Sequence, residues 1–137
     1  MVVFIDSSAI YAYLARDDQN HTRSLATFKD LVTQGVDLLT TNYVLLETTA
    51  LVQKRLGLDA VRTFQREFAP MVRRVDWVSE HDHLGAMEAL LLAGRRKLSL
   101  VDCVSFQYMR KLGLTTAFTF DDHFREQGFT VVPEPAG

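Results

Sequence analysis

The sequence has little cysteine, little proline and no long apolar run, and each shortage excludes a class of protein. Cys103 is the single cysteine, so no disulfide can form within the chain. Three prolines and seven glycines among 137 residues exclude a collagen-like rod and a disordered low-complexity chain. Apolar runs such as Ala89–Ala93 are far shorter than the ~20 residues that span a bilayer. The 47% hydrophobic and 23% charged side chains are typical of a globular domain.

The chain also lacks an excess of basic charge. Its 15 basic and 17 acidic residues give a formal net charge of −2, which excludes strong non-specific attraction to nucleic acid by bulk charge alone. This net charge does not exclude a local basic surface. Because the cysteine is alone and Met1 leads into an apolar strand without a basic leader, we expect a cytoplasmic protein with no membrane segment.

Apolar patterning predicts strands that alternate with helices. Short β-branched or apolar runs predict strands over 2–5, 36–40, 72–78, 115–120 and 129–132. Helical spacing, capping residues and terminating glycines predict helices over 7–14, 21–34, 42–56, 59–71, 80–93, 100–112 and 121–127. This order implies a mostly parallel sheet of about five strands in a three-layer α/β/α sandwich. We expect one domain over 1–132 and a short tail over 133–137.

Four acidic residues stand where such a fold places its ligand site. Asp6 directly follows the first predicted strand, and Asp121 directly follows the fourth. Glu47 and Asp102 lie in the early turns of helices that begin at the same edge of the sheet. Ligands in open α/β folds bind beyond the carboxyl ends of the strands. Four carboxylates from distant parts of the chain are therefore candidates for one cleft.

Each carboxylate also has a structural alternative. Asp6 and Asp121 are good N-caps for the helices that follow them. Asp102 stands three residues after Ser99, as the acid of a capping box does. Glu47 is hardest to explain in this way, because its helical neighbours three and four positions away include no cation.

Together the four acids predict a bound cation. Carboxylates ~5 Å apart repel by roughly 3 kcal/mol per pair at an effective dielectric of 20. Oxygen-only ligation selects hard divalent ions, so the sequence predicts Mg²⁺ or Mn²⁺ rather than zinc or copper.

The segments around these acids resemble the motifs of a known family. They read Val-Phe-Ile-Asp-Ser-Ser over 3–8, Thr-Thr-Asn-Tyr-Val-Leu-Leu-Glu over 40–47, Leu-Ser-Leu-Val-Asp-Cys over 98–103 and Thr-Phe-Asp-Asp-His-Phe over 119–124. Their order and spacing resemble the PIN-domain family over essentially the whole chain. Within it, the chain is similar to the small single-domain ribonucleases that act as toxins of VapBC (VapC-type) toxin–antitoxin pairs.

The resemblance implies roles for particular residues. It implies a catalytic, metal-binding cluster made of Asp6, Glu47, Asp102 and Asp121. Ser7 and Thr119 would support the metal shell through hydroxyl hydrogen bonds, although a cap or strand role is an alternative for each. Asp122 leaves the register of the last motif open, and the motif favours Asp121. Cys103 stands where the family often has a small residue, and we interpret it as a buried hydrophobe.

The same resemblance implies a function and partners. It implies a Mg²⁺- or Mn²⁺-dependent endoribonuclease with RNA as substrate, a small cognate antitoxin and a homodimer. The antitoxin's inhibitory segment should place an Arg or Lys near the acidic pocket, because a cation relieves the same repulsion as the metal.

Charge counting is compatible with an RNA substrate. Without the four candidate ligands, 13 of the 17 acidic residues remain against 15 basic ones, of which 11 are Arg. Candidate phosphate-contacting groups are Arg55, Arg62, Arg66, Arg73, Arg74, Arg95, Arg96 and Lys97, although each cluster also fits an ordinary solvated face. His123 is the histidine nearest the expected site, and substrate contact is its candidate role.

Rival functions fit less well. A receiver domain would need an acidic pair after the first strand and a late lysine, but Asp6 stands alone and no lysine follows Lys111. A haloacid-dehalogenase-type phosphatase would need Asp-x-Asp where the chain has Asp6-Ser7-Ser8. A non-catalytic PIN-like module that binds RNA or protein stays the main alternative.

Overall fold

A computed structural model describes residues 1–135 and shows a five-stranded parallel sheet. The spatial order is β3-β2-β1-β4-β5, and every neighbouring pair is parallel. The strands are β1 (Val2–Ile5), β2 (Asp37–Thr41), β3 (Arg74–Asp76), β4 (Thr116–Phe118) and β5 (Thr130–Val132). This sheet confirms the expected fold class. The division into a domain over 1–132 and a tail stays a prediction, and residues 136–137 of that tail lie outside the described part.

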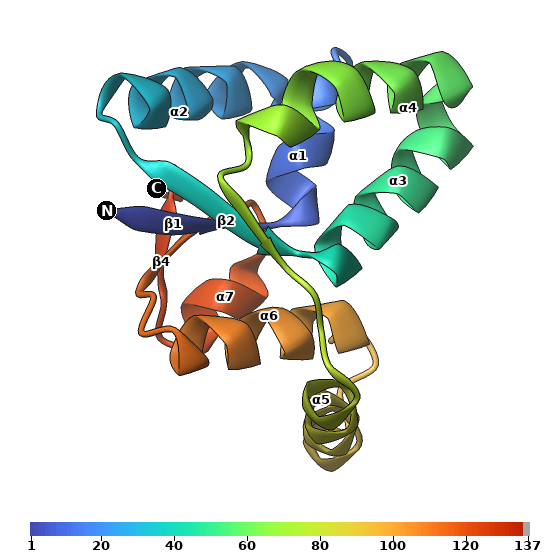
Figure 1. Cartoon of the computed structure of the whole chain (residues 1–137), viewed down its shortest axis with the longest axis vertical. Coiled ribbons are helices and arrows are strands. Elements are labelled where there is room, and N and C mark those ends of the chain that lie inside the picture. Colours follow the sequence, from blue (N-terminus) through green and yellow to red (C-terminus); the bar gives the residue numbers. More distant parts are fainter. Residues whose placement is uncertain (136–137) are drawn as a thin grey trace.

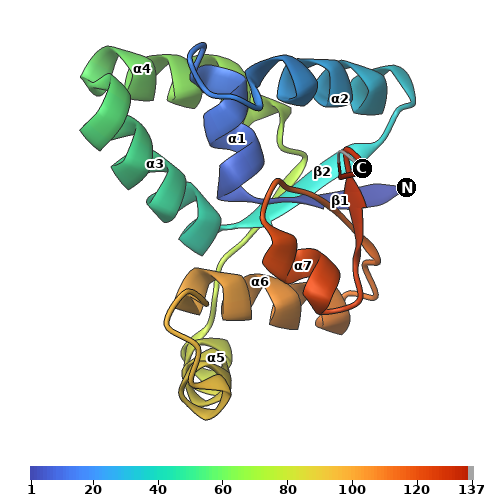
Figure 2. The ribbon, with the colours of Figure 1, turned by 180° about the vertical axis from the view of Figure 1, so that it is seen from behind.

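Helices cover both faces of the sheet (Figure 1). One layer holds α1 (Ser7–Leu14), α2 (His21–Thr33), α3 (Asn42–Leu56) and α4 (Leu58–Thr63). The opposite layer holds α6 (Leu100–Lys111) and α7 (Asp122–Glu126), and α5 (Glu80–Ala93) packs outside it against α6. The reverse view in Figure 2 shows the same three layers. Within residues 1–135, no helix is long and apolar enough to cross a membrane.

One predicted helix and two predicted strands were wrong in their extent. The chain over 59–71 is not a single α-helix, because α4 gives way to a π-helical segment, η1 (Phe64–Phe68), and a 3-10 turn, η2 (Ala69–Met71). Pro70 lacks the N–H that would continue the α-helical ladder, which explains the change of pitch before it. The strands expected over 72–78 and 115–120 pair over only three residues each, since β3 is an edge strand and the chain leaves β4 after Phe118.

The core lies on both sides of β1. Val3, Phe4 and Ile5 are fully buried, as the continuous apolar run predicted for a central strand. Aromatic rings fill each side: Tyr13, Phe28, Phe64 and Phe68 pack together in one layer, and Phe106, Phe124 and Phe129 pack together in the other. Large apolar residues thus hold the central strands rigidly beneath the loops at their carboxyl ends.

Capping residues start several helices at this carboxyl edge. Thr41 Oγ1 accepts a hydrogen bond from the backbone N–H of Val44 at 3.3 Å and so begins α3 directly where β2 ends. Gly94 ends α5 in the left-handed region with φ of 62°, a conformation that favours glycine. Short strand–helix turns therefore bring the first turns of helices to one side of the molecule.

Candidate active site

The four acidic residues singled out in the sequence line one pocket of about 430 Å³ at the carboxyl edge of the sheet. Asp6 ends β1, Glu47 stands in the second turn of α3, Asp102 in the first turn of α6, and Asp121 before α7. Each comes from a different strand–helix junction or helix start. The topology, rather than sequence proximity, brings them together.

Asp6 is the most buried of these acids. Its side chain is 2% exposed, and Oδ2 accepts hydrogen bonds from the hydroxyls of Ser8 at 2.8 Å and Thr119 at 3.0 Å. The pKa of Asp6 is raised to about 7, first by burial and then by the negative charges of Asp102 and Glu47, against the lowering effect of the hydrogen bonds from Ser8 and Thr119. The protein therefore holds this carboxylate where ionisation is unfavourable unless a cation is present.

Asp102 belongs to a complete capping box. Its N–H donates to Ser99 Oγ at 3.0 Å, and its Oδ2 accepts from the N–H of Ser99 at 3.1 Å. Burial raises the pKa of Asp102 to about 6; the charges of Asp121 and Glu47 also raise it, against the lowering effect of the Ser99 hydrogen bonds. A helix dipole alone would lower the pKa of a capping acid, so the raised pKa reflects first the burial of Asp102 and then the neighbouring carboxylates.

Glu47 and Asp121 are each oriented by a hydroxyl or backbone contact. The Ser7 hydroxyl donates to Glu47 Oε1, which links the start of α1 to α3. The Asp121 Oδ1 accepts from the N–H of His123 at 2.9 Å, and the Asp121 N–H donates to Thr119 Oγ1 at 2.9 Å. Ser7 and Thr119 thus each hydrogen-bond one of the four acids, Glu47 and Asp6 respectively.

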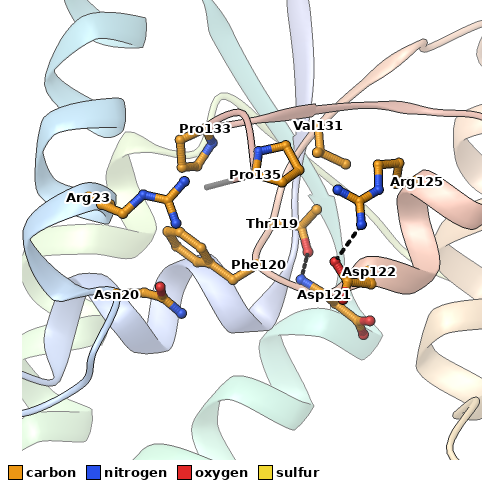
Figure 3. Close-up of a pocket in the computed structure, with 10 residues that line it drawn as sticks. All are labelled: Asn20, Arg23, Thr119, Phe120, Asp121, Asp122, Arg125, Val131, Pro133 and Pro135. Carbon is orange, nitrogen blue, oxygen red and sulfur yellow. Dashed lines mark hydrogen bonds and ion pairs between the residues drawn. The ribbon is translucent and has the colours of Figure 1, made fainter. Parts of the chain in front are cut away.

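The neighbouring Asp122 points elsewhere. Its side chain is 76% exposed and pairs with Arg125 at 3.1 Å, and it lines a second pocket beside the acidic one (Figure 3). Asp121 lines both pockets. The geometry therefore favours Asp121 over Asp122 as the acid of the last motif.

His123 is a further possible metal ligand, for which the sequence suggested only a contact with the substrate. Ligand atoms of Asp102, Asp121 and His123 all lie within 4.8 Å of one another, close enough to share an ion. The Nδ1 atom of His123 is buried and has no hydrogen-bond partner among residues 1–135. The sequence signal was only its position two residues after Asp121, which does not reveal which way an imidazole on the first turn of α7 points.

The structural and functional explanations of these acids are compatible. Asp6, Asp102 and Asp121 do accept hydrogen bonds from the backbone of their own helix starts, as the capping alternative required. The cap of α1 is long, with Ser8 N–H 3.4 Å from Asp6 Oδ2. The caps fix each carboxylate at the edge of the sheet, and the sheet topology makes those edges converge.

The basic residues divide into two groups. Arg55 and Lys97 line the acidic pocket, and the Arg55 guanidinium lies 5.3 Å from the centre of the Tyr11 ring. Three other candidates form ion pairs elsewhere: Arg62 with Asp59, Arg74 with Asp76 and Arg95 with Glu126. Sequence clustering was thus a poor guide to which basic residues face the site.

Several pocket residues had no distinctive sequence signal. Ser8 bonds both Asp6 and the N–H of Phe120, and lies 3.1 Å from Thr119 Oγ1, so it ties β1 to the loop after β4. Asp18 and Asn20 reach the pocket from the loop between α1 and α2. The Ser7-Ser8 dipeptide beside Asp6 could have indicated Ser8 as a pocket residue. Asp18 and Asn20 could not be assigned to the pocket without knowledge of the fold.

The donor set fits a hard divalent cation. All four acids offer oxygen, the ligand type that Mg²⁺ and Mn²⁺ prefer. The neighbouring carboxylates, after burial, help to raise the pKa values of Asp6 and Asp102, and an ion would relieve that repulsion. The pocket therefore offers a set of oxygen ligands that could hold a divalent cation.

Comparison with known proteins defines the class. The PIN domain model matches residues 3–129, so the chain belongs to the PIN-domain family.

Particular relatives narrow the comparison. The chain is 33% identical over 132 residues to the 23S rRNA-specific endonuclease VapC20 of Mycobacterium tuberculosis, a match covering 96% of this chain and 98% of that protein. The crystal structure of VapC20, described as a sarcin-ricin loop cleaving toxin, matches with a TM-score of 0.79 and 32% identity over 95% of this chain and 97% of that one. FitAcB from Neisseria gonorrhoeae (TM-score 0.68, 16% identity, 96% of each chain) and VapBC2 from Rickettsia felis (TM-score 0.67, 11% identity, 96% and 97%) share the fold.

Proposed function

We propose that this protein is a metal-dependent endoribonuclease and the toxin of a toxin–antitoxin pair. The observation that carries the proposal is the convergence of Asp6, Glu47, Asp102 and Asp121 in one pocket of a PIN-domain fold. The 33% identity to an rRNA endonuclease over nearly the whole chain supports it.

The pocket residues suggest a division of labour. A bound Mg²⁺ or Mn²⁺ would supply a polarised water and a counter-charge for the phosphate. Asp6, Asp102 and Asp121 would hold the ion, and Glu47, oriented by Ser7, would hold it or accept a proton from the attacking water. Arg55 and Lys97 at the pocket wall would contact the phosphates of the RNA.

For the RNA, we propose 23S rRNA. VapC20 is described as specific for 23S rRNA and as cleaving the sarcin-ricin loop, and this chain aligns with 98% of its length. The first test is cleavage of that loop on isolated ribosomes, mapped by primer extension. Cleavage elsewhere in rRNA, or of tRNA alone, would contradict this choice of substrate and leave the nuclease assignment intact.

The chemistry is tested by comparing the wild type with Asp6→Asn and Asp102→Asn. Wild-type protein should cut RNA with Mg²⁺ or Mn²⁺ and leave 5′-phosphate and 3′-hydroxyl ends, and both variants should lose most activity. Asp30→Asn, an exposed helix substitution, is the matched control. Cleavage that persists in excess EDTA, or a 2′,3′-cyclic phosphate product, would exclude hydrolysis by metal-activated water.

We also propose an antitoxin and a homodimer. VapC20 is described as a toxin, and the structural neighbour VapBC2 is described as bound to a DNA fragment from its promoter; both descriptions support an antitoxin partner for this chain. An Arg or Lys of that partner would suit the acidic pocket. Exposed leucines of α5, Leu84, Leu91 and Leu92, are candidates for a self-association face. Light scattering at micromolar concentration should give a dimer, and a monomer would contradict this proposal. The cytoplasm stays our expectation for its location.

A non-catalytic binding module is the second candidate function. All four acids are present and hydrogen-bonded in place, which favours an enzyme. RNA binding without cleavage at any Mg²⁺ or Mn²⁺ concentration would favour the binding module.

A further inference from the structure

A second pocket, of about 330 Å³, lies against the acidic pocket (Figure 3). Asn20, Phe120 and Asp121 line both, so these residues form a wall that the two cavities share. Nothing in the proposed hydrolysis uses this second cavity. A strand of RNA whose phosphate occupied the acidic pocket would pass over this wall.

Two arginines from different helices reach into the second pocket. Figure 3 shows Arg23, on α2, and Arg125, on α7, on opposite sides of it. Arg125 pairs with Asp122, and both side chains are more than half exposed. Arg23 forms no ion pair with a carboxylate among residues 1–135; it donates to the Glu134 carbonyl oxygen at 2.6 Å. The Arg23 guanidinium is therefore not held in an ion pair within this part of the chain, although Asp121 and Asp122 also line the pocket.

Part of the remaining wall is apolar and aromatic, and the rest is polar, with Asn20, Thr119, Asp121 and Asp122. The Arg23 guanidinium lies 5.6 Å from the centre of the Phe120 ring, and Val131 and Pro133 also line the cavity. A flat apolar surface beside cations is how proteins hold nucleotides of a single strand, with the base on the surface and the phosphate at the cations. The volume is at the lower end of small-ligand sites, about 300–1,000 Å³, which suits one nucleotide.

We propose that this pocket binds the RNA nucleotide next to the scissile phosphate, with Arg23 and Arg125 on its phosphate and its base against Phe120. The inference rests on the proposed RNA-cleaving function. Arginine suits this role because its planar guanidinium matches phosphate oxygens in pairs. The two arginines are then positioning residues that set affinity and register, and they do not take part in the hydrolysis.

Binding and kinetics of Arg23→Gln and Arg125→Gln test the proposal. The matched control is Arg62→Gln, because Arg62 is also exposed and also pairs with an acid three residues away, Asp59, but lines neither pocket. The probe is a fluorescent RNA stem-loop with the sarcin-ricin loop sequence, with Mg²⁺ present. Binding is read by anisotropy in the Asp6→Asn background to keep the RNA intact, and cleavage kinetics in the wild-type background.

Each pocket variant should weaken RNA binding about tenfold, as removal of a charged hydrogen bond implies. The slope of log affinity against log salt should fall by about 0.7 for each phosphate that the variant no longer binds. In the cleavage assay, KM should rise while kcat stays within about twofold of the value for the parent protein. Arg62→Gln should match its parent in every readout. A merely structural role for the arginines, such as anchoring the chain at Glu134, would not change the salt slope.

Equal affinity and equal salt slope in the parent and all three variants would overturn the proposal, whether the common affinity is high or undetectable. So would a fall in kcat at unchanged KM. If KM stays unchanged while the pocket variants escape inhibition by a co-expressed antitoxin, the arginines contact a protein partner instead. Failure of the proposed function is separate, because it would appear as RNA binding without metal-dependent cleavage by the wild type.

Discussion

Asp6→Asn should make the metal-free protein more stable at pH 8 and leave it nearly unchanged at pH 5. The folded-state pKa of Asp6 is raised from 3.8 to about 7. A raised pKa means that the folded state keeps its proton while the unfolded chain loses it. Stability associated with Asp6 is thus fully present below about pH 4 and is lost as the pH rises to about 7.

The magnitude follows from the shift. About three pKa units at ~1.4 kcal/mol each set an upper limit of about 4 kcal/mol for the loss at high pH, of which about 3 kcal/mol falls between pH 5 and pH 8. Asparagine avoids this loss but weakens the hydrogen bonds from Ser8 and Thr119, at about 1 kcal/mol each. The variant should gain about 2 kcal/mol at pH 8, or roughly 6 °C or more in Tm, and almost nothing at pH 5.

Urea unfolding at both pH values in EDTA measures this difference. Asp30→Asn, exposed on α2, should follow the wild type at each pH. Asp6→Ala should be less stable than Asp6→Asn because it also loses the cap of α1, at about 0.5–2 kcal/mol. If both Asp6→Asn and Asp6→Ala are less stable than the wild type by an amount that does not depend on pH, Asp6 is only a helix cap and the argument is refuted.

Three further outcomes are expected. Mg²⁺ or Mn²⁺ should raise the Tm of the wild type by an amount that follows RT ln(1 + [L]/Kd), and should raise that of Asp102→Asn less; an equal rise in both would place the ion elsewhere. Asp122→Asn should keep kcat and lower KM for RNA several-fold, because it frees Arg125; a loss of kcat would make Asp122 a ligand instead. Ser7→Ala should reduce kcat about 10- to 100-fold with little change in Tm, since it releases Glu47; full activity would show that Glu47 needs no such support.

The fold could be predicted from the sequence because its signals are local. The apolar run over 2–5, the helical pattern over 80–93 and the capping residue Ser99 place β1, α5 and α6 within one or two residues. The π-helical segment before Pro70 could not be predicted in this way, because a proline marks where an α-helix must stop but not the pitch of the turns before it.

The site was predictable in part, for a similar reason. An acid directly after a strand is visible in the sequence, and the carboxyl-edge rule says where it lies. Arg23 and Arg125 carry no such mark, because they stand on ordinary amphipathic helices and meet only through the fold. Arg62, one of the candidate phosphate contacts in the sequence, lines neither pocket and pairs with its helix neighbour Asp59.

Capping explains how the chain keeps repelling carboxylates together without a metal. Hydrogen bonds from the backbone of Ser99 to Asp102 and of His123 to Asp121 hold each acid at the start of a helix, where the dipole favours negative charge. Each such contact offsets part of the repulsion, at ~0.5–2 kcal/mol against roughly 3 kcal/mol per pair. The remaining repulsion adds to burial, the larger cause, in raising the pKa values of Asp6 and Asp102. The pocket is therefore preorganised but incompletely compensated, so a cation that bound there would need little rearrangement of these side chains and would stabilise the fold.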